Sequence, residues 1–551
     1  MPAFHRLATH EPPPSSRTSY DATTEAASHD VTNDHLPSME IDQRSNDSTG
    51  DVPVLVDTPI LVDLGSHRDH STKHLGVLTL TILVFYNVSG GPFGAEAAVR
   101  AGGNRMALLG FLLGPLVWSI QEALLTAELG TTFPEAGAGV AWVEEAFGPK
   151  AGWFCGYLGW IAGATDNAIY PVLFLDYLQE MLGQSSDASA ESDATAAEER
   201  PIKRFLLLSF ASAVLGYINW RGLDVVGKLS VYIAVIAMSP FVIMTIVGSF
   251  KVDHERWLEW PPPSTEQDGS DSTIFQSIQW APLLNNLFWN LNSFDAAGSF
   301  AGEIEPSKFH RGMLWGTLLV ALCYFLPLLV AIGASPPTSE RRPGDWEDGY
   351  LTIVNAEVVG PWLGTWTVMA AGISNIALFQ AELSADAFQL MGMADRGHAP
   401  RIFGRKSQHG TPTYGIVLGL IVILLMDFVS NLDQLIEMLN FNYAVALLME
   451  YAAFFQLRIK HPDLERPFRI PFGIVGCFFF FLPSLLATLL ILSLAGKATY
   501  IMFASIVAVG IVMLSLWQKD EDPHQYDPNL PVSDPETDVM TNAETTGLAS
   551  D

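Results

Sequence analysis

The chain has 551 residues, of which 49% are apolar and only 16% are charged, and its formal net charge is −30. A soluble protein of this length normally carries about a quarter charged residues, so the composition excludes an ordinary soluble multidomain protein. Low charge content joined to a large acidic excess means that the excess is confined to parts of the sequence.

The acidic excess lies mainly at the two ends of the chain. Residues 1–70 carry twelve acidic and four basic residues, and residues 519–551 carry nine acidic residues and one lysine. Few large apolar residues accompany these charges, which is typical of disordered segments. We therefore predict disordered acidic tails at 1–73 and 518–551, on either side of a nearly neutral hydrophobic body.

Apolar segments of about 17 to 25 residues recur through this body, and that length crosses a hydrocarbon core about 30 Å thick. They predict an all-α multi-pass membrane protein with twelve transmembrane helices. No pattern of a cleaved signal peptide precedes them, so the first segment is expected to act as the targeting element. The predicted spans are 75–100, 106–131, 151–182, 204–220, 227–250, 275–302, 310–334, 361–392, 413–431, 434–457, 470–495 and 498–517.

The distribution of Lys and Arg predicts the orientation. The two most basic loops, 396–409 and 458–469, fall on the same side of the membrane as both tails. The positive-inside rule assigns that side to the cytosol. The three other acidic stretches, 183–200, 253–273 and 339–348, then face the outside.

The three cysteines all lie within apolar segments. This location favours small buried side chains over an extracellular disulfide framework. The chain contains no HExxH, CxxC or phosphate-loop pattern. We therefore predict no enzyme activity, no metal site and no cofactor.

Two predicted spans contain residues that disfavour a continuous helix. The first holds Ser89-Gly90-Gly91-Pro92-Phe93-Gly94, in which Pro92 lacks an N–H and the glycines relax the backbone. The sixth holds a polar cluster between Trp289 and Gly298. Unwound backbone at bilayer depth is tolerated where it lines a cavity, and breaks five helices apart are typical of 5+5 inverted repeats. The alternative is that these residues only kink the two helices.

Six carboxyl groups lie far enough inside predicted spans to need an explanation, because a charge at the bilayer centre costs roughly 2.5–3.5 kcal/mol. Such groups face a cavity, pair with another side chain or take up a proton. We predict a substrate or proton role for Asp166 and Asp295, whereas a hydrogen bond between helices or a cytosolic gate explains Glu122, Glu128 and Glu450 equally well. The six are Glu122, Asp166, Asp295, Glu382, Asp386 and Glu450.

Several longer motifs follow one another along residues 75–517. They are VSGGPFG at 88–94 with Glu96 behind it, WSIQEALLTAELG at 118–130, FPE at 133–135, DNAIYPVLFLDY at 166–177, FWNLN at 288–292, AGEIE at 301–305 and RIKHPDLERP at 458–467. In these motifs the chain resembles the amino acid–polyamine–organocation (APC) transporter superfamily, and within it the polyamine uptake transporters of plants and protists.

This resemblance implies a LeuT-type fold with broken helices 1 and 6 and alternating access. The inverted repeats would cover 74–250 and 275–457, and 458–517 would hold a basic inner loop and the last two helices. It also implies secondary active import coupled to protons, that is, symport. The plant pattern has aromatic residues after Asn292, whereas this chain reads Ser293-Phe294-Asp295-Ala296, so its pocket and its substrate profile can differ.

The chemistry of the breaks favours a polyamine such as putrescine or spermidine. Amino acid carriers of this fold hold the substrate carboxylate on free N–H groups of half-helices. Pro92 removes one such N–H, and Asp295 adds a negative charge. Both changes suit ammonium groups, which need carboxylates and aromatic faces. A neutral or cationic amino acid remains the alternative substrate.

The candidate site follows from these arguments. Proton coupling is expected at a buried carboxyl group, either Glu122 or Asp166, and Glu382 and Asp386 are candidate gates. The candidate substrate-binding residues are Ser89, Gly90, Gly91, Phe93, Gly94, Asp166, Tyr170, Trp289, Asn290, Asn292, Phe294 and Asp295.

A transport-dead substrate sensor is the alternative from another functional class. Some superfamily members pair covalently with a single-span subunit through a cysteine between helices 3 and 4, but 183–200 contains no cysteine. We therefore expect no covalent partner subunit and no nucleic-acid partner. The expected membrane is the cell membrane, with a vacuolar or other endomembrane as the alternative.

Overall fold

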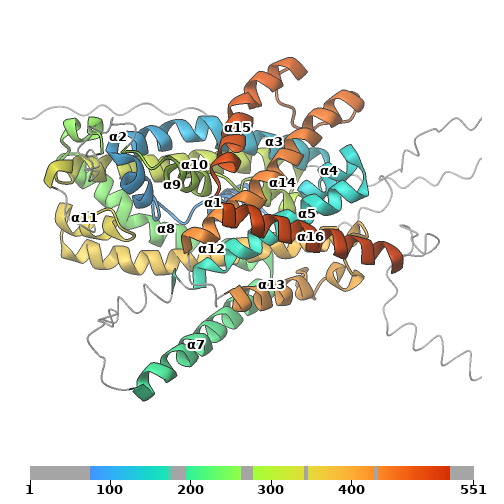
Figure 1. Ribbon diagram of the computed structural model, residues 1–551, viewed down its shortest axis with the longest axis horizontal. Helices are drawn as coiled ribbons and strands as arrows, with labels where there is room; N and C mark the ends of the chain where they lie inside the picture. The colour runs from blue at the N-terminus through green and yellow to red at the C-terminus, as the bar shows by residue number, and fades with distance from the viewer. Residues whose placement is uncertain are drawn as a thin grey trace, which may run out of the picture. The chain divides into compact units, whose positions relative to one another are not determined.

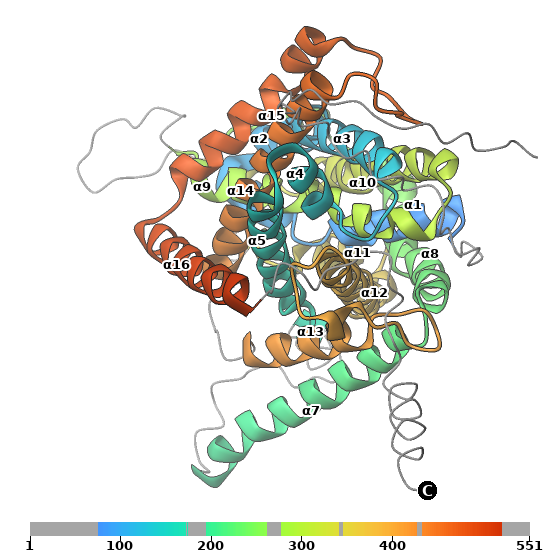
Figure 2. The ribbon, with the colours of Figure 1, turned by 90° about the vertical axis from the view of Figure 1, so that its right-hand side faces the viewer.

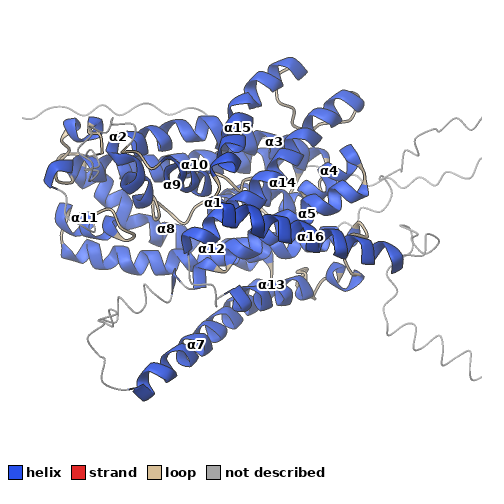
Figure 3. Ribbon diagram, in the orientation of Figure 1, coloured by secondary structure: helices blue, strands red, loops and turns tan. Residues whose placement is uncertain are grey.

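The computed structural model describes residues 75–171, 173–174, 194–261, 277–340, 345–426 and 432–520, all within one structural unit of the chain. The predicted N-terminal tail, 1–73, lies outside these ranges, as do residues 521–551 of the predicted C-terminal tail. Among the described residues, β pairing is limited to one isolated bridge between Lys406 and Pro412. The prediction of an all-α protein is confirmed for this part of the chain (Figure 3).

Helices follow one another along the described chain (Figure 1). The α-helices are α1 Val77–Val88, α2 Glu96–Gly114, α3 Ile120–Thr132, α4 Gly139–Phe147, α5 Pro149–Asn167, α7 Ala194–Trp220, α8 Leu223–Gly248, α9 Trp280–Leu291, α10 Pro306–Ala334, α11 Tyr350–Val358, α12 Pro361–Asp395, α13 Thr413–Met426, α14 Leu432–Lys460, α15 Ile474–Leu494 and α16 Lys497–Asp520. A π-helical turn, η1 Pro115–Ser119, joins α2 to α3, and the 3-10 segments are η2 His254–Leu258, η4 Asp295–Glu303, η5 Thr338–Glu340 and η6 Arg401–Gly404.

Seven of the described helical segments are long and apolar enough to cross a membrane. Three shorter apolar helices, Val77–Val88, Phe205–Trp220 and Thr413–Met426, match further predicted spans. These findings support a multi-pass membrane protein, while the number of twelve spans stays a prediction. The seven are Glu96–Thr132, Leu223–Gly248, Pro306–Ala334, Pro361–Asp395, Leu435–Lys460, Ile474–Leu494 and Lys497–Leu516.

The long helix α12 runs through the middle of the helix packing. It contacts α1, α5, α8 and α13, and it is buried along most of its length, polar side chains included. Helix α14 packs on α4 and α5, and carries α15 and α16 on its other side (Figure 2). Helices α15 and α16 expose large apolar side chains such as Val475 and Ile501, as expected of surfaces that face lipid.

The first predicted break is present in the structure. Helix α1 ends at Val88, Ser89 is extended, and α2 begins only at Glu96. Gly91 and Gly94 between them have φ values of 116° and 83°, a region that side chains with a Cβ rarely adopt. The glycines singled out in the sequence therefore permit the unwound segment.

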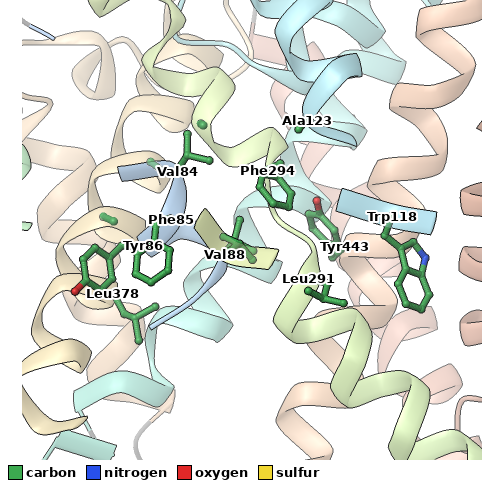
Figure 4. Close-up of a cluster of buried hydrophobic side chains, with 14 of the residues drawn as sticks. Val84, Phe85, Tyr86, Val88, Trp118, Ala123, Leu291, Phe294, Leu378 and Tyr443 are labelled. Carbon is green, nitrogen blue, oxygen red and sulfur yellow. The ribbon is translucent and has the colours of Figure 1, made fainter. Parts of the chain in front are cut away.

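The second predicted break lies between α9 and η4. Asn292 is extended, and Ser293 adopts a left-handed conformation with φ 74°. A non-glycine residue in this conformation needs support from its surroundings. Here the Ser293 N–H donates to the Tyr443 hydroxyl at 3.1 Å. Figure 4 shows Leu291 and Phe294, on either side of the break, near Tyr443 and near Val88 at the end of α1.

Candidate functional site

Two cavities lie at the breaks. The first, which we call the Ser89 cavity, has a volume of about 960 Å³ including the part open to solvent, and it extends from the α1 break to Arg100 and Asp348. The second, the Glu450 cavity, has a volume of about 770 Å³ measured in the same way and extends from the α9 break to the start of α4. Four residues line both cavities: Asn87, Asp166, Trp289 and Ser293.

A side-chain hydrogen bond lies where the two cavities meet. Asp166 is in the last turn of α5, and Trp289 is near the end of α9. The indole N–H of Trp289 donates to Asp166 Oδ1 at 3.0 Å. Both side chains line the two cavities, together with Asn87 and Ser293.

Most of the predicted substrate-binding residues line one or both cavities. Two do not: Gly91 is absent from both linings, and the Phe294 ring is fully buried in the hydrophobic core. The Ser89 cavity includes Ser89, Gly90, Phe93, Gly94, Asp166, Tyr170, Trp289 and Asn290. The Glu450 cavity includes Asp166, Trp289, Asn292, Asp295 and the two gate candidates Glu382 and Asp386.

The Glu450 cavity is strongly acidic. Five carboxyl groups line it, and no Lys, Arg or His is among its described lining residues. The Tyr170 hydroxyl donates to Glu382 at 2.7 Å, which leaves the acidic character of the wall intact. The five are Asp166, Asp295, Glu382, Asp386 and Glu450.

Two glycines make room for these carboxyl groups. A Cβ atom at Gly163 of α5 would overlap the carboxyl group of Asp386, and one at Gly139 of α4 would overlap that of Glu450. Both glycines also line the Glu450 cavity. The local sequence therefore lets two carboxyl groups lie against neighbouring backbone.

Several buried polar atoms at the cavities have no protein partner. Both amide atoms of Asn87 and of Asn292 lack one, as do Oε2 of Glu382 and Oε2 of Glu450. Buried polar groups are normally hydrogen-bonded, to water where no protein group reaches them. These atoms are thus available to a polar ligand. Among the described residues, no group of His, Cys, Asp and Glu is arranged to hold a metal ion.

Glu122 lies behind the second break and lines neither cavity. Its Oε1 atom accepts the backbone N–H groups of Phe294 and Asp295 and the hydroxyl of Tyr443. The carboxylate therefore caps the N-terminus of η4, where free N–H groups would otherwise attract an anion.

Glu128 belongs to a buried ion pair. Pairing with another side chain was one of the explanations that the sequence left open for carboxyl groups inside predicted spans. Its two oxygens accept from Nε and Nη2 of Arg458, and Arg466 lies 3.4 Å away. Glu128 and Arg458 are both buried. This pair joins α3 to the end of α14, away from the residues that line the two cavities.

A second ionic cluster joins the end of α12 to the segment around α4. Arg396 contacts both oxygens of Glu135, at 2.7 and 3.1 Å, and Glu144 at 2.7 Å. Burial opposes the ionisation of Glu144, but hydrogen bonds from His398 and Arg396 outweigh it and lower the pKa of Glu144. Burial likewise opposes the charge of Arg396, yet its carboxylate partners raise the pKa of Arg396 further.

The three cysteines are free, and Cys155 and Cys477 are buried while Cys323 is half-buried. The predicted burial is confirmed for Cys155 and Cys477, and Cys323 is less buried than predicted. Sequence reasoning missed Tyr443, and assigned Glu450 no substrate role. A signal was present, because Tyr443 and Glu450 are seven residues apart and so lie on one face of α14.

Residues 75–517 match the amino acid permease family. The probable polyamine transporter At3g19553 of Arabidopsis thaliana is 40% identical over 457 residues, which cover 82% of this chain and 89% of that protein. Polyamine transporter PUT1 of Oryza sativa subsp. japonica is 36% identical over 453 residues, 82% of this chain and 80% of that protein. Polyamine transporter RMV1 of Arabidopsis thaliana is 36% identical over 446 residues, 80% of this chain and 84% of that protein.

Proposed function

The chain belongs to the amino acid permease family and is a multi-pass membrane transporter, and from that premise we propose that it imports polyamines by proton symport. The observation that carries the choice of substrate is the Glu450 cavity, which is lined by five carboxyl groups and by no described basic residue. A linear polycation with several ammonium groups neutralises such a wall, whereas an anion or a zwitterion does so poorly.

The hydrogen bonds that side chains accept from backbone N–H groups at the two breaks also favour an amine substrate over an amino acid. A substrate carboxylate would need free N–H groups at the half-helices. The N–H groups of Phe294 and Asp295 donate to Glu122, and the N–H of Gly91 donates to the Ser89 hydroxyl at 3.1 Å. At each break, side chains of the protein therefore accept N–H groups that a substrate carboxylate would otherwise use.

The proposed path leads through the two cavities in turn. The polycation enters the Ser89 cavity, passes Asp166 and Trp289, and reaches the Glu450 cavity, where Asp295 and Glu450 are its carboxylate partners. Asn292 and Tyr170 supply neutral hydrogen bonds. Glu382 and Asp386 serve as the gate toward the inner side.

The proposed architecture is a twelve-helix LeuT-type fold with two inverted repeats, 74–250 and 275–457. In this proposal the unwound segments 89–95 and 292–294 are equivalent positions of the two repeats, and their breaks allow alternating access between the cavities. With both termini in the cytosol, the Glu450 cavity faces inward and the Ser89 cavity outward. The proposed membrane is the cell membrane.

Uptake of labelled spermidine by a transporter-deficient cell tests this function. Putrescine, arginine and leucine are added as competitors at two external pH values. We expect putrescine to compete, leucine not to compete, and uptake to rise at the lower external pH. Competition by leucine or arginine alone would support an amino acid carrier, and binding of spermidine without any uptake would support a sensor.

A further inference from the structure

The hydroxyl of Tyr443 lies between the carboxyl groups of Glu122 and Asp295 at the second break. Its Oη atom lies 2.6 Å from Glu122 Oε1 and 2.5 Å from Asp295 Oδ1, and it accepts the Ser293 N–H at 3.1 Å. Asp295 lines the Glu450 cavity, whereas Glu122 is fully buried and lines neither of the two cavities. The phenol therefore connects a carboxyl group that ligands reach with one that they do not.

The donors and acceptors in this trio imply an additional proton. A phenol has one proton to donate and accepts through its lone pairs. Only one of the two carboxyl oxygens can accept that proton. The second carboxyl group can lie at hydrogen-bond distance from the phenol oxygen only if that carboxyl group is itself protonated and donates to the phenol. Glu122 and Asp295 thus share one proton.

In the part of the chain that the structure describes, no basic side chain is among the titratable neighbours of this trio. Its described titratable neighbours are Glu450, which lies beside Asp295, and Tyr451, both on α14, together with Cys155 on α5. None of them carries a positive charge. A proton is therefore the cation that the trio can hold without a ligand in the cavity.

We propose that Glu122 is the proton-holding group of the transport cycle and that it exchanges its proton with the Glu450 cavity through Tyr443 and Asp295. This inference rests on the proposed proton-coupled import of polyamines. In the transfer, the O–H bond of Asp295 breaks as the phenol oxygen gains that proton, and the phenol's own proton passes to Glu122. No other reactant is needed.

The transfer leaves Asp295 ionised at the cavity wall while the proton stays bound at Glu122. A substrate ammonium group can then pair with Asp295, so the proton and the polyamine are carried together. If Asp295 were the only proton site, the two cations would compete for it, and the result would be exchange in place of symport.

Protonation of Glu122 also acts on the break itself. A carboxylate accepts hydrogen bonds roughly twice as strong as those of a neutral acceptor. The N–H groups of Phe294 and Asp295 are therefore held less firmly once Glu122 is protonated. Loading of the proton thereby loosens the start of η4, one of the two unwound segments on which alternating access depends.

Measurements on full-length protein in proteoliposomes can test this proton relay, from the Glu450 cavity through Asp295 and Tyr443 to Glu122, separately from transport itself. Two assays are compared: spermidine accumulation driven by a pH gradient, and exchange of labelled for unlabelled spermidine, which needs no net proton movement. The variants are Glu122→Gln, which can still accept from both N–H groups, and Tyr443→Phe, which removes only the hydroxyl. Tyr451→Phe is the matched control, because its hydroxyl, on the same helix, bonds to Ser484.

We expect Glu122→Gln and Tyr443→Phe to lower gradient-driven accumulation at least tenfold and to lower exchange less than threefold. The control should stay within twofold of wild type in both assays. Accumulation at the wild-type level in Tyr443→Phe, or equal losses in both assays for both variants, would overturn the relay while leaving the transport function in place. Wild-type protein that moves no spermidine in either assay would overturn the proposed function, and the relay with it.

Discussion

The indole N–H of Trp289 donates to the carboxylate of Asp166 at 3.0 Å, where the Ser89 cavity meets the Glu450 cavity. On the proposed path, an ammonium group of the polyamine replaces Trp289 as the partner of Asp166. The hydrogen bond thus separates the two cavities while it is present. Once it is broken, the Asp166 carboxylate is free to bind an ammonium group of the substrate.

Asp166→Asn should raise the apparent KM for spermidine about tenfold or more, because a hydrogen bond to a charged group contributes roughly 1.5–3 kcal/mol. Trp289→Phe keeps an aromatic ring and the carboxylate, so its effect on KM should be smaller. Uptake kinetics at fixed pH measure both. As a control, Glu357→Gln removes an exposed carboxyl group outside both cavities and should leave KM unchanged. An unchanged KM in Asp166→Asn would refute a role for this carboxylate in substrate binding.

Gly163→Ala should reduce spermidine uptake, because the added methyl group would overlap the carboxyl group of Asp386 and displace it from the cavity wall. Gly139→Ala should act in the same way on Glu450. The control is Gly473→Ala, where an added Cβ meets no atom within 4 Å. Initial rates, corrected for the amount of protein in the membrane, give the comparison. Equal rates for all three variants would mean that Asp386 and Glu450 are not needed at these positions.

The two breaks were predictable from the sequence because Gly, Pro and clustered polar residues act locally on the helix. The partners of the buried carboxyl groups could not be predicted from the sequence. Glu122 meets the backbone of Phe294 across 172 residues, and Glu128 meets Arg458 across 330. Neither contact leaves a periodic signal. The Phe294 ring was predicted to face the substrate, but it lies in the hydrophobic core. This error arose because Ser293, just before it, has a left-handed backbone conformation that redirects the chain and that the local sequence does not reveal.

The pairing of Glu144 with Arg396 should make stability depend on pH at the acidic end. The folded-state pKa of Glu144 is lowered, so its stabilising contribution is complete above the ordinary value of about 4.3 and is lost as pH falls through the lower folded value. Arg396, whose pKa is raised, stays charged throughout. Thermal unfolding of purified protein at several pH values should therefore give a higher Tm for wild type than for Glu144→Gln at pH 6. A difference that persisted unchanged at pH 3 would contradict this assignment.

The buried pair of Glu128 and Arg458 should contribute to folding without contributing to substrate binding. Removal of Arg458 leaves the buried Glu128 with only the longer contact to Arg466, and loss of a buried ion-pair partner typically costs about 3–5 kcal/mol. Arg458→Met should therefore lower the thermal stability of the purified protein strongly. The double variant Glu128→Gln with Arg458→Met removes both charges of the pair and should recover part of the loss, while the charge of Arg466 beside them remains. Unfolding curves of the two single variants and the double variant measure the coupling between the two residues. Losses that simply add in the double variant would mean that the two charges do not depend on each other.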